Sequence, residues 1–301
     1  MRVIAVINQK GGVGKTTTVA NLGAAVASRG HDTCLIDMDP QSHLTLHLGV
    51  EEGSVQVSTY DLLTEKVQVA SAVLQIAPHL WLIPSVIDLA AAEVELAATV
   101  GREQVLRDRL AAQELPFELA MIDCPPSLGL LTLNALAAAN EVIIPLQPHF
   151  LALQGLGKLL ETVSLVQRRI NPGLYVSGVI PCMYESGTRL ASEVLADLKA
   201  FFAAARNTAA PWAQARIYET LIRRNVKLAE CPSYGKTIFD YEPNSRGAED
   251  YRRLAEEFLS CSLPPETQPG TAAEQPATHP PASSVPTTAA AGAETPSLPR
   301  S

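Results

Sequence analysis

The sequence has few cysteines, and no two of them form a C-x-x-C pair. The five cysteines are odd in number and lie far apart, at positions 34, 124, 182, 231 and 261. A disulfide framework or a structural zinc site needs paired cysteines at close spacing. We therefore expect reduced thiols in a cytoplasmic protein.

The chain also lacks an excess of positive charge and a long apolar run. Its 23 Lys and Arg are outnumbered by 31 Asp and Glu, so a protein that is basic all over is excluded, but a local basic patch is not. The first apolar run is interrupted by Asn8, Gln9 and Lys10, which argues against a signal peptide. The longest apolar region, residues 128–146, contains Asn, Glu and Pro, and it predicts a helix followed by a strand instead of a membrane span.

What the chain does have is a regular alternation of apolar strand-like runs with segments rich in Ala and Leu. Strands are expected at residues 2–8, 33–37, 81–84, 118–123, 141–146 and 175–180. Helices are expected at residues 16–28, 88–97, 102–112, 130–138 and 152–170. This alternation predicts an α/β fold with a doubly wound, mostly parallel sheet, helices on both faces, and ligands at the carboxyl ends of the strands.

The composition changes abruptly near the C-terminus. Residues 262–301 hold nine of the 22 prolines together with many Ala, Thr and Ser, and they show no apolar periodicity. Such a segment cannot bury enough surface to offset the entropy of ordering. We expect a folded domain at 1–261 and a disordered Pro/Ala-rich tail at 262–301, which serves either as a solvated extension or as a partner-binding or spacer segment.

A glycine-rich turn lies between the first expected strand and the first expected helix, in the stretch "NQKGGVGKTTT" at residues 8–18. Gly11, Gly12 and Gly14 allow backbone angles and a close approach that a Cβ would block. The backbone N–H groups of such a turn and the N-terminus of the helix attract phosphate. The turn therefore predicts a nucleotide site.

Two lysines bracket this turn. Lys15 is expected to reach the β- and γ-phosphates, and the Thr16 hydroxyl is expected to bind Mg²⁺. The usual phosphate-loop pattern requires glycine at position 9, where this chain has Gln9, so the loop is a variant. The purpose of the second lysine, Lys10, does not follow from the pattern.

Three aspartates end apolar strands near this loop in the expected sheet. Asp37 and Asp39 lie in "CLIDMDPQS", and Asp123 lies in "LAMIDCPPS". Each one alone is as compatible with a helix cap or a turn as with a functional site. Together they suggest that Asp39 orients or activates water and that Asp123 is the carboxylate on the metal side.

These motifs together resemble the ParA/MinD family of deviant Walker A ATPases, and within it the short chromosomal (Soj-like) ParA proteins. The resemblance covers about residues 1–260 and rests on "NQKGGVGKTTT", "IDMDPQS", "LIPS" (82–85), "IDCPPSLGLLTLNAL", "LALQGLGKL" and "IRRNVKLAECPSYGKTI". It implies a P-loop NTPase fold of the deviant Walker A type. It also implies a Mg²⁺-dependent, partner-stimulated ATPase whose cofactors are ATP and Mg²⁺.

The resemblance also implies roles for individual residues. Lys10 matches the lysine that reaches the nucleotide of the partner subunit, Asp39 matches the carboxylate needed for hydrolysis, and Asp123 matches the Walker B aspartate. By the same resemblance, catalysis involves Lys10, Lys15 and Asp39, and the metal lies near Thr16, Asp123 and Asp39. The residues expected to bind the nucleotide are Lys10, Gly11, Gly12, Val13, Gly14, Lys15, Thr16 and Thr17 at the phosphates and Pro181, Met183 and Asn225 at the base.

The implied function is an ATP-dependent homodimer that binds DNA without sequence preference and partitions a chromosome or plasmid. The implied partner is a ParB-type centromere-binding protein, and the expected location is cytoplasmic and nucleoid-associated, without membrane binding. Arg189 and Arg216 are the best candidates for DNA contacts, whereas Arg223, Arg224 and Lys227 serve either DNA or the dimer and nucleotide. No helix-turn-helix segment is expected before the first strand, so binding to a specific operator is not predicted.

Two alternatives on the same fold stay open at this point. One is a MinD-like, membrane-bound positioning ATPase, which needs a basic amphipathic helix at the C-terminus that the Pro/Ala-rich tail does not provide. Other cargo-positioning ATPases, which use the same DNA-bound switch, belong with this alternative. An iron–sulfur carrier needs paired cysteines, which the chain lacks.

Overall fold

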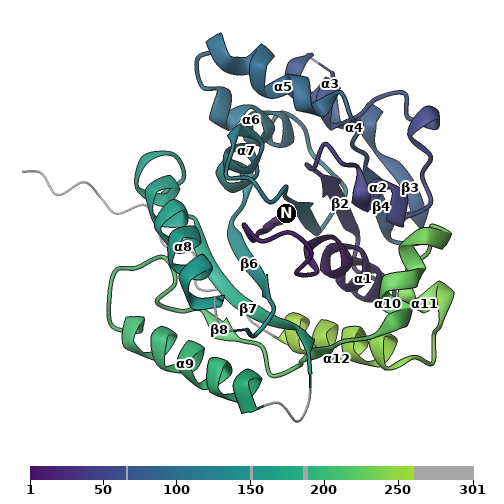
Figure 1. Ribbon diagram of the computed structural model, residues 1–301. Coiled ribbons are helices and arrows are strands. Elements are labelled where there is room, and N and C mark those ends of the chain that lie inside the picture. The colour runs from purple at the N-terminus through teal and green to yellow at the C-terminus, as the bar shows by residue number, and fades with distance from the viewer. Residues whose placement is uncertain (66, 150–151, 186–188, 261–301) are drawn as a thin grey trace, which may run out of the picture. The chain divides into compact units, whose positions relative to one another are not determined.

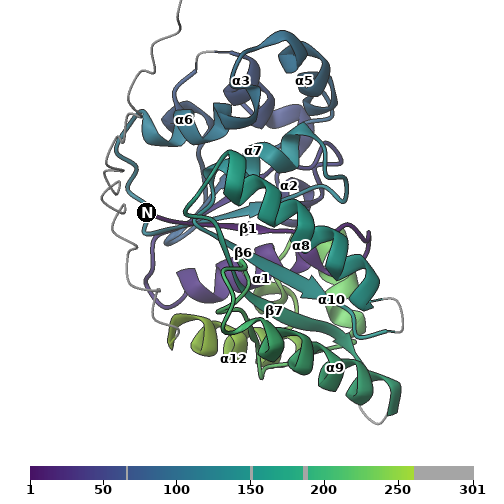
Figure 2. The same ribbon diagram turned by 90° about the vertical axis from the view of Figure 1, so that its left-hand side faces the viewer.

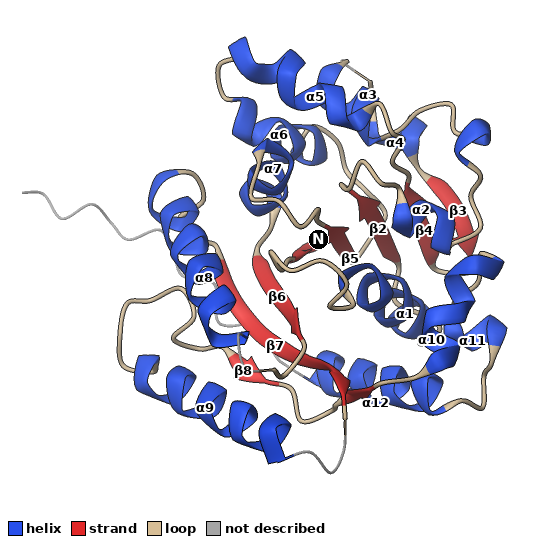
Figure 3. Cartoon of the chain, viewed as in Figure 1, coloured by secondary structure: helices blue, strands red, loops and turns tan. Residues whose placement is uncertain are grey.

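The structure is a computed structural model that describes residues 1–65, 67–149, 152–185 and 189–260. The nine strands of its sheet are β1 (Arg2–Val6), β2 (Thr33–Asp37), β3 (Leu74–Ala77), β4 (Leu80–Ile83), β5 (Leu119–Asp123), β6 (Glu141–Leu146), β7 (Tyr175–Tyr184), β8 (Arg216–Ile217) and β9 (Ile222–Arg223). They follow the order β3-β4-β2-β5-β1-β6-β7-β8, with β9 paired to β7 (Figure 1). Only β3 runs antiparallel to its neighbour, at the edge beside β4 (Figure 3).

Helices cover both faces of the sheet. They are α1 (Lys15–Ala27), α2 (His43–His47), α3 (Thr59–Thr64), α4 (Val69–Ala72), α5 (Leu89–Glu95), α6 (Val105–Ala111), α7 (Leu130–Ala138), α8 (Ala152–Arg169), α9 (Arg189–Ala205), α10 (Val226–Glu230), α11 (Ile238–Tyr241) and α12 (Arg246–Ser260). Four short 3₁₀ turns are η1 (Glu52–Ser54), η2 (Leu96–Ala98), η3 (Arg102–Gln104) and η4 (Cys231–Tyr234). In Figure 2 the strands lie between α7 and α8 above and α1 and α12 below.

The strands divide the core into two layers because their side chains alternate between the faces. In β1, Val3 and Ala5 join the cluster formed with helices α3 to α9, whereas Ile4 and Val6 join the cluster formed with α1, α2 and α10 to α12. The side chains on both faces of β1 are thus buried, which explains the continuous apolar run in its sequence. The predicted doubly wound, mostly parallel sheet is confirmed.

Several elements differ from the sequence prediction. Strand β3 was not predicted, because "LQIA" is half exposed and lacks an apolar run. The two-residue strands β8 and β9 give no pattern at all. Strand β7 continues beyond the predicted end at residue 180 to Tyr184, and the helix predicted at 102–112 is a 3₁₀ turn followed by α6. The tail predicted at 262–301 lies outside the described residues.

The register brings the carboxyl ends of the central strands together. Val6 of β1 lies opposite Asp123 of β5, and Asp37 of β2 also lies opposite Asp123. The phosphate loop follows β1 directly, so the loop and both aspartates lie at the same edge of the sheet. This edge is where ligands bind in doubly wound folds.

Candidate active site

The phosphate loop opens into a cavity of about 560 Å³. Gly12 and Gly14 have φ angles of 70° and 92°, in the left-handed region that glycine adopts without strain. Gly14 is also the N-cap of α1 and supplies no capping side chain, so it covers none of the free N–H groups in the first turn. The loop and helix end therefore offer backbone donors to an anion in this cavity.

The two lysines of the loop take different directions. Lys15 is buried and lines the cavity, and its Nζ lies 3.4 Å from the carbonyl oxygen of Lys10. Burial lowers the pKa of Lys15, and the nearby Asp123 counteracts this. Lys10 is exposed, and its Nζ lies 2.8 Å from His149 Nε2 and 3.5 Å from Gln147 Oε1. Of the two side chains, Lys15 lines the cavity and Lys10 does not.

A hydroxyl and a carboxylate lie side by side behind the loop. Thr16 Oγ1 donates a hydrogen bond of 2.6 Å to Asp123 Oδ2. The other oxygen, Asp123 Oδ1, is buried and has no hydrogen-bond partner within the residues that the structure describes. Burial, with Asp37 close by, raises the pKa of Asp123 well above its usual value.

This pair fits Mg²⁺, which prefers hard oxygen ligands and usually keeps several waters and phosphate oxygens. An unsatisfied buried carboxylate oxygen is costly, and a cation nearby would stabilise its charged form. Within the described part of the chain, no group of three or more His, Cys, Asp and Glu residues forms a closed metal site. Thr16 and Asp123 would hold Mg²⁺ at this position.

Asp39 approaches the same cavity from the end of β2. Its side chain lines the cavity, and its Oδ1 accepts a hydrogen bond of 3.0 Å from the backbone N–H of Gln41. Asp37, two residues earlier, is fully buried, and burial raises its pKa to about 6. The structure thus separates the two carboxylates: Asp39 faces the ligand space and Asp37 faces the protein.

A second cavity of about 430 Å³ adjoins the first, and Gly14, Thr17 and Met183 line both. The predicted base residues Met183 and Asn225 line it, and Asn225 also caps α10 by accepting a hydrogen bond from Lys227 N–H. Pro181 does not line it, because it is buried in the sheet opposite Leu146.

Sequence reasoning missed other residues of this second cavity. Cys182 and Tyr251 line it, and the Thr18 hydroxyl lies 3.2 Å from the Tyr251 hydroxyl and 3.8 Å from Cys182 Sγ. Tyr251 belongs to α12, far along the chain, so only its place in an amphipathic helix is visible in the sequence. Val13, predicted at the phosphates, has a buried side chain and lines neither cavity.

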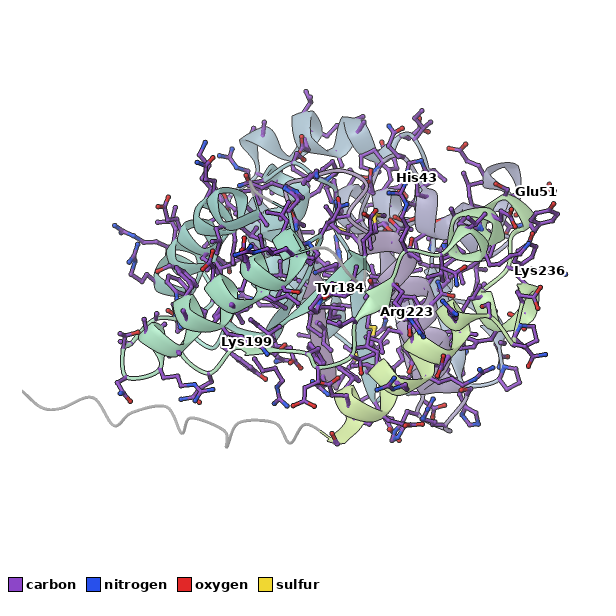
Figure 4. All side chains as sticks on the ribbon, turned by 60° about the horizontal axis from the view of Figure 1, so that its bottom comes forward. His43, Glu51, Tyr184, Lys199, Arg223 and Lys236 are labelled. Carbon is purple, nitrogen blue, oxygen red and sulfur yellow. The ribbon has the colours of Figure 1, made fainter. Side chains whose placement is uncertain are left out.

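The basic residues predicted to contact DNA lie on several elements. Arg189 is highly exposed at the start of α9 and pairs with Glu193, and Arg216 lies on the edge strand β8. Arg223 and Arg224 line the second cavity, and a role toward DNA or toward the dimer and nucleotide stays a prediction for both. In Figure 4 Arg223 lies near Tyr184, its partner in the β7–β9 pairing, and away from Lys199 on α9.

Besides Arg189, three of these basic side chains pair with acids. Arg223 donates to buried Asp250, with a 3.0 Å hydrogen bond from its Nε, and to Glu249 at 2.9 Å. Arg224 pairs with Glu185 at 3.0 Å. Lys227 pairs with Glu230 at 2.9 Å. Their role toward DNA stays a prediction.

Within the part of the chain that the structure describes, no helix combines the length and the apolar character needed to cross a membrane.

Comparison with known proteins gives consistent matches over the folded part. The family model described as an AAA domain matches residues 1–176. The chain is 44% identical over 260 residues to the sporulation initiation inhibitor protein Soj of Bacillus subtilis, which covers 86% of this chain and 98% of that protein. It is 40% identical over 263 residues to the chromosome partitioning protein ParA of Caulobacter vibrioides, which covers 86% of this chain and 94% of that protein.

Solved structures share the architecture. The structure named cobyrinic acid a,c-diamide synthase from Mycobacterium smegmatis, with bound ADP and magnesium, matches with a TM-score of 0.72 and 38% identity, covering 86% of this chain and 94% of that one. The cell division ATPase MinD of Pyrococcus furiosus matches with a TM-score of 0.67 at 24% identity, covering 86% and 98%, and so shares the fold.

Proposed function

The chain belongs to the Soj/ParA family of chromosome-partitioning ATPases, and on that premise we propose that it is a switch in which ATP joins two copies of the chain and hydrolysis separates them. The observation that carries the proposal is that the side chains of the two loop lysines lie in different places. Lys15 enters the cavity of its own chain, whereas Lys10 extends from the outside of the same loop. A cation in that position is suited to a nucleotide held by a second copy.

The chain is an ATPase, and ATP and Mg²⁺ are its cofactors. Mg²⁺ would supply positive charge that neutralises the negative charge of the phosphates. In the proposed site Thr16 and Asp123 hold the metal, and Lys15 with the loop N–H groups holds the phosphates. The Asp39 carboxylate lines the cavity, and the Gln41 N–H bonds to only one of its two oxygens. In the proposed mechanism Asp39 orients the water that attacks the terminal phosphate or accepts a proton from it.

Electrostatics explains why dimerisation would depend on ATP. Two nucleotides brought face to face place several negative charges between like surfaces, which repel each other without additional cations. A lysine donated by each copy supplies that charge only when nucleotide is bound. ATP then shifts the monomer–dimer equilibrium by its higher affinity for the dimer, and loss of the terminal phosphate removes the bias.

In the proposed function the dimer binds DNA without reading bases, associates with the nucleoid, and is reset by a ParB-type partner that stimulates hydrolysis. The support from the structure is the exposed Arg189 at the start of α9 and Arg216 on the edge strand β8. Contacts of such side chains to phosphates give affinity without sequence specificity. Two copies would double the number of these contacts, so dimerisation would strengthen binding.

Co-sedimentation with random-sequence DNA tests this proposal. We expect binding with ATP and Mg²⁺, and weak or no binding with ADP or without nucleotide. Because the contacts are to phosphates, we also expect binding to weaken by about tenfold or more when salt rises from about 50 to about 200 mM. Equal binding in all three nucleotide states would refute the switch.

A further inference from the structure

The peptide groups on both sides of Asp39 are held by side chains that the proposed chemistry does not use. The Asp39 N–H donates a hydrogen bond of 3.1 Å to Asp37 Oδ1. The Asp39 carbonyl oxygen accepts a hydrogen bond of 2.8 Å from Ser85 Oγ. The backbone of the candidate hydrolytic residue is therefore fixed from two directions.

Thr45 connects these two contacts into a closed ring. Its Oγ1 donates to Asp37 Oδ2 at 2.7 Å and accepts from the Ser85 backbone N–H at 2.9 Å. Its own N–H donates to the same Asp37 oxygen at 2.9 Å. The ring runs from Asp39 through Asp37, Thr45 and Ser85 back to Asp39.

The ring is buried and joins separate elements. Asp37, Thr45 and Ser85 are fully buried, and Asp39 is 8% exposed. Asp37 ends β2, Thr45 lies in α2, and Ser85 follows β4; Figure 1 shows α2 next to the end of β2. Buried polar groups that satisfy one another in this way have few alternative arrangements, so the ring defines one position for the loop that carries Asp39.

We propose that Thr45 and Ser85 are positioning residues that hold the Asp39 carboxylate in its hydrolytic position. This inference rests on the role of Asp39 in the proposed function. The ring holds the Asp39 N–H and the Asp39 carbonyl oxygen. A shift of either peptide group would therefore move the Asp39 carboxylate directly. Displacements of about 1 Å at a reacting group can reduce a rate by as much as a hundredfold.

Asp37 anchors the ring as its acceptor. Its carboxylate receives three hydrogen bonds, from the Asp39 N–H and from the N–H and hydroxyl of Thr45. Burial raises the pKa of Asp37, and the bonds from Thr45 act in the opposite direction by favouring the charged form. Removing the Thr45 hydroxyl leaves the Ser85 N–H without its acceptor. It also removes the bond from that hydroxyl to Asp37, so the ring loses two of its contacts.

The experiment compares full-length variants in steady-state ATP hydrolysis with Mg²⁺. Thr45→Val removes the bridging hydroxyl at nearly constant shape, and Thr45→Ser keeps it. Ser85→Ala removes the contact to Asp39, and it carries the test if Thr45→Val does not fold. Thr33→Ala is the matched control: Thr33 is buried at the other end of β2, where its hydroxyl also donates to a main-chain oxygen.

We expect kcat to fall by about tenfold in Thr45→Val and Ser85→Ala, with KM changed by less than about twofold. Thr45→Ser and Thr33→Ala should keep the wild-type kcat. In an Asp39→Ala background, Ser85→Ala should cause no further loss, because it acts through Asp39.

Two results would overturn the inference. One is wild-type kcat in both Thr45→Val and Ser85→Ala; the other is an equal loss in Thr33→Ala, which would indicate a general effect on stability. Failure of the proposed function would look different: Asp39→Ala alone would then hydrolyse ATP at the wild-type rate.

Discussion

Lys15→Ala is expected to abolish nucleotide-dependent behaviour altogether. The substitution removes the buried ammonium from the phosphate cavity, and a hydrogen bond to a charged group contributes about 1.5–3 kcal/mol, or roughly a 10- to 150-fold change in affinity. Hydrolysis should fall further still, because charge on the terminal phosphate would lose its nearest cation. The measurement is the dissociation constant for ATP with Mg²⁺, followed by the rate of hydrolysis.

Without nucleotide, Lys15→Ala should fold as well as the wild type. Burial of the Lys15 charge is itself unfavourable, so its removal should not destabilise the fold. At the same excess of ATP, the melting temperature of the wild type should rise by more than that of Lys15→Ala. Lys158→Ala, which removes an exposed lysine of α8 outside both cavities, is the matched control and should behave as wild type. ATP binding by Lys15→Ala at wild-type affinity would contradict the site.

Asp39→Ala is expected to separate binding from hydrolysis. Its carboxylate lines the cavity but makes no hydrogen bond to Lys15 or Thr16, so affinity for ATP should change by only a few-fold. Loss of a positioned acceptor for the attacking water should lower the rate by about a hundredfold or more. The variant should therefore accumulate as the ATP-bound dimer, which size-exclusion chromatography with and without ATP would detect.

Asp39→Asn is the informative companion to this variant. An amide oxygen can still accept the Gln41 N–H bond and preserve the turn, but it is a poor proton acceptor. We expect Asp39→Asn to lose hydrolysis nearly as completely as Asp39→Ala. Wild-type hydrolysis by either variant would remove Asp39 from the mechanism.

The sequence was sufficient for the central strands and the phosphate loop. Strands β2 and β6 and helix α7 have the predicted bounds, because both faces of these strands are buried and their apolar runs are continuous. The loop was recognisable because its glycines, Lys15 and Thr16 are consecutive in the chain. Edge elements were harder to predict: β3 is half exposed, and β8 and β9 are too short for any periodicity.

Sites assembled from distant segments were not predictable in the same way. The ring around Asp39 joins Thr45 and Ser85, 40 residues apart in sequence and in contact through a single hydrogen bond. The basic run from Arg216 to Lys227 looked continuous, but the chain turns through β8, β9 and α10 and distributes those side chains over an edge strand, a cavity and a helix. Only the three-dimensional arrangement separates these roles.

The central claim is that Lys10 serves the nucleotide of the neighbouring copy, and subunit mixing tests it most directly. Lys10→Ala has a complete cavity but no lysine to donate, whereas Asp39→Ala donates Lys10 but cannot hydrolyse. Each variant alone should be nearly inactive. In a mixed dimer, one of the two sites receives both Lys10 and Asp39.

The measurement is ATP hydrolysis by an equal mixture of the two variants, with mixed dimers verified by differential tagging. With random pairing in a two-fold symmetric dimer, we expect recovery to about a quarter of the wild-type rate. If mixed dimers form and the rate stays at the average of the two variants measured separately, Lys10 does not act on its neighbour and the proposed switch is wrong.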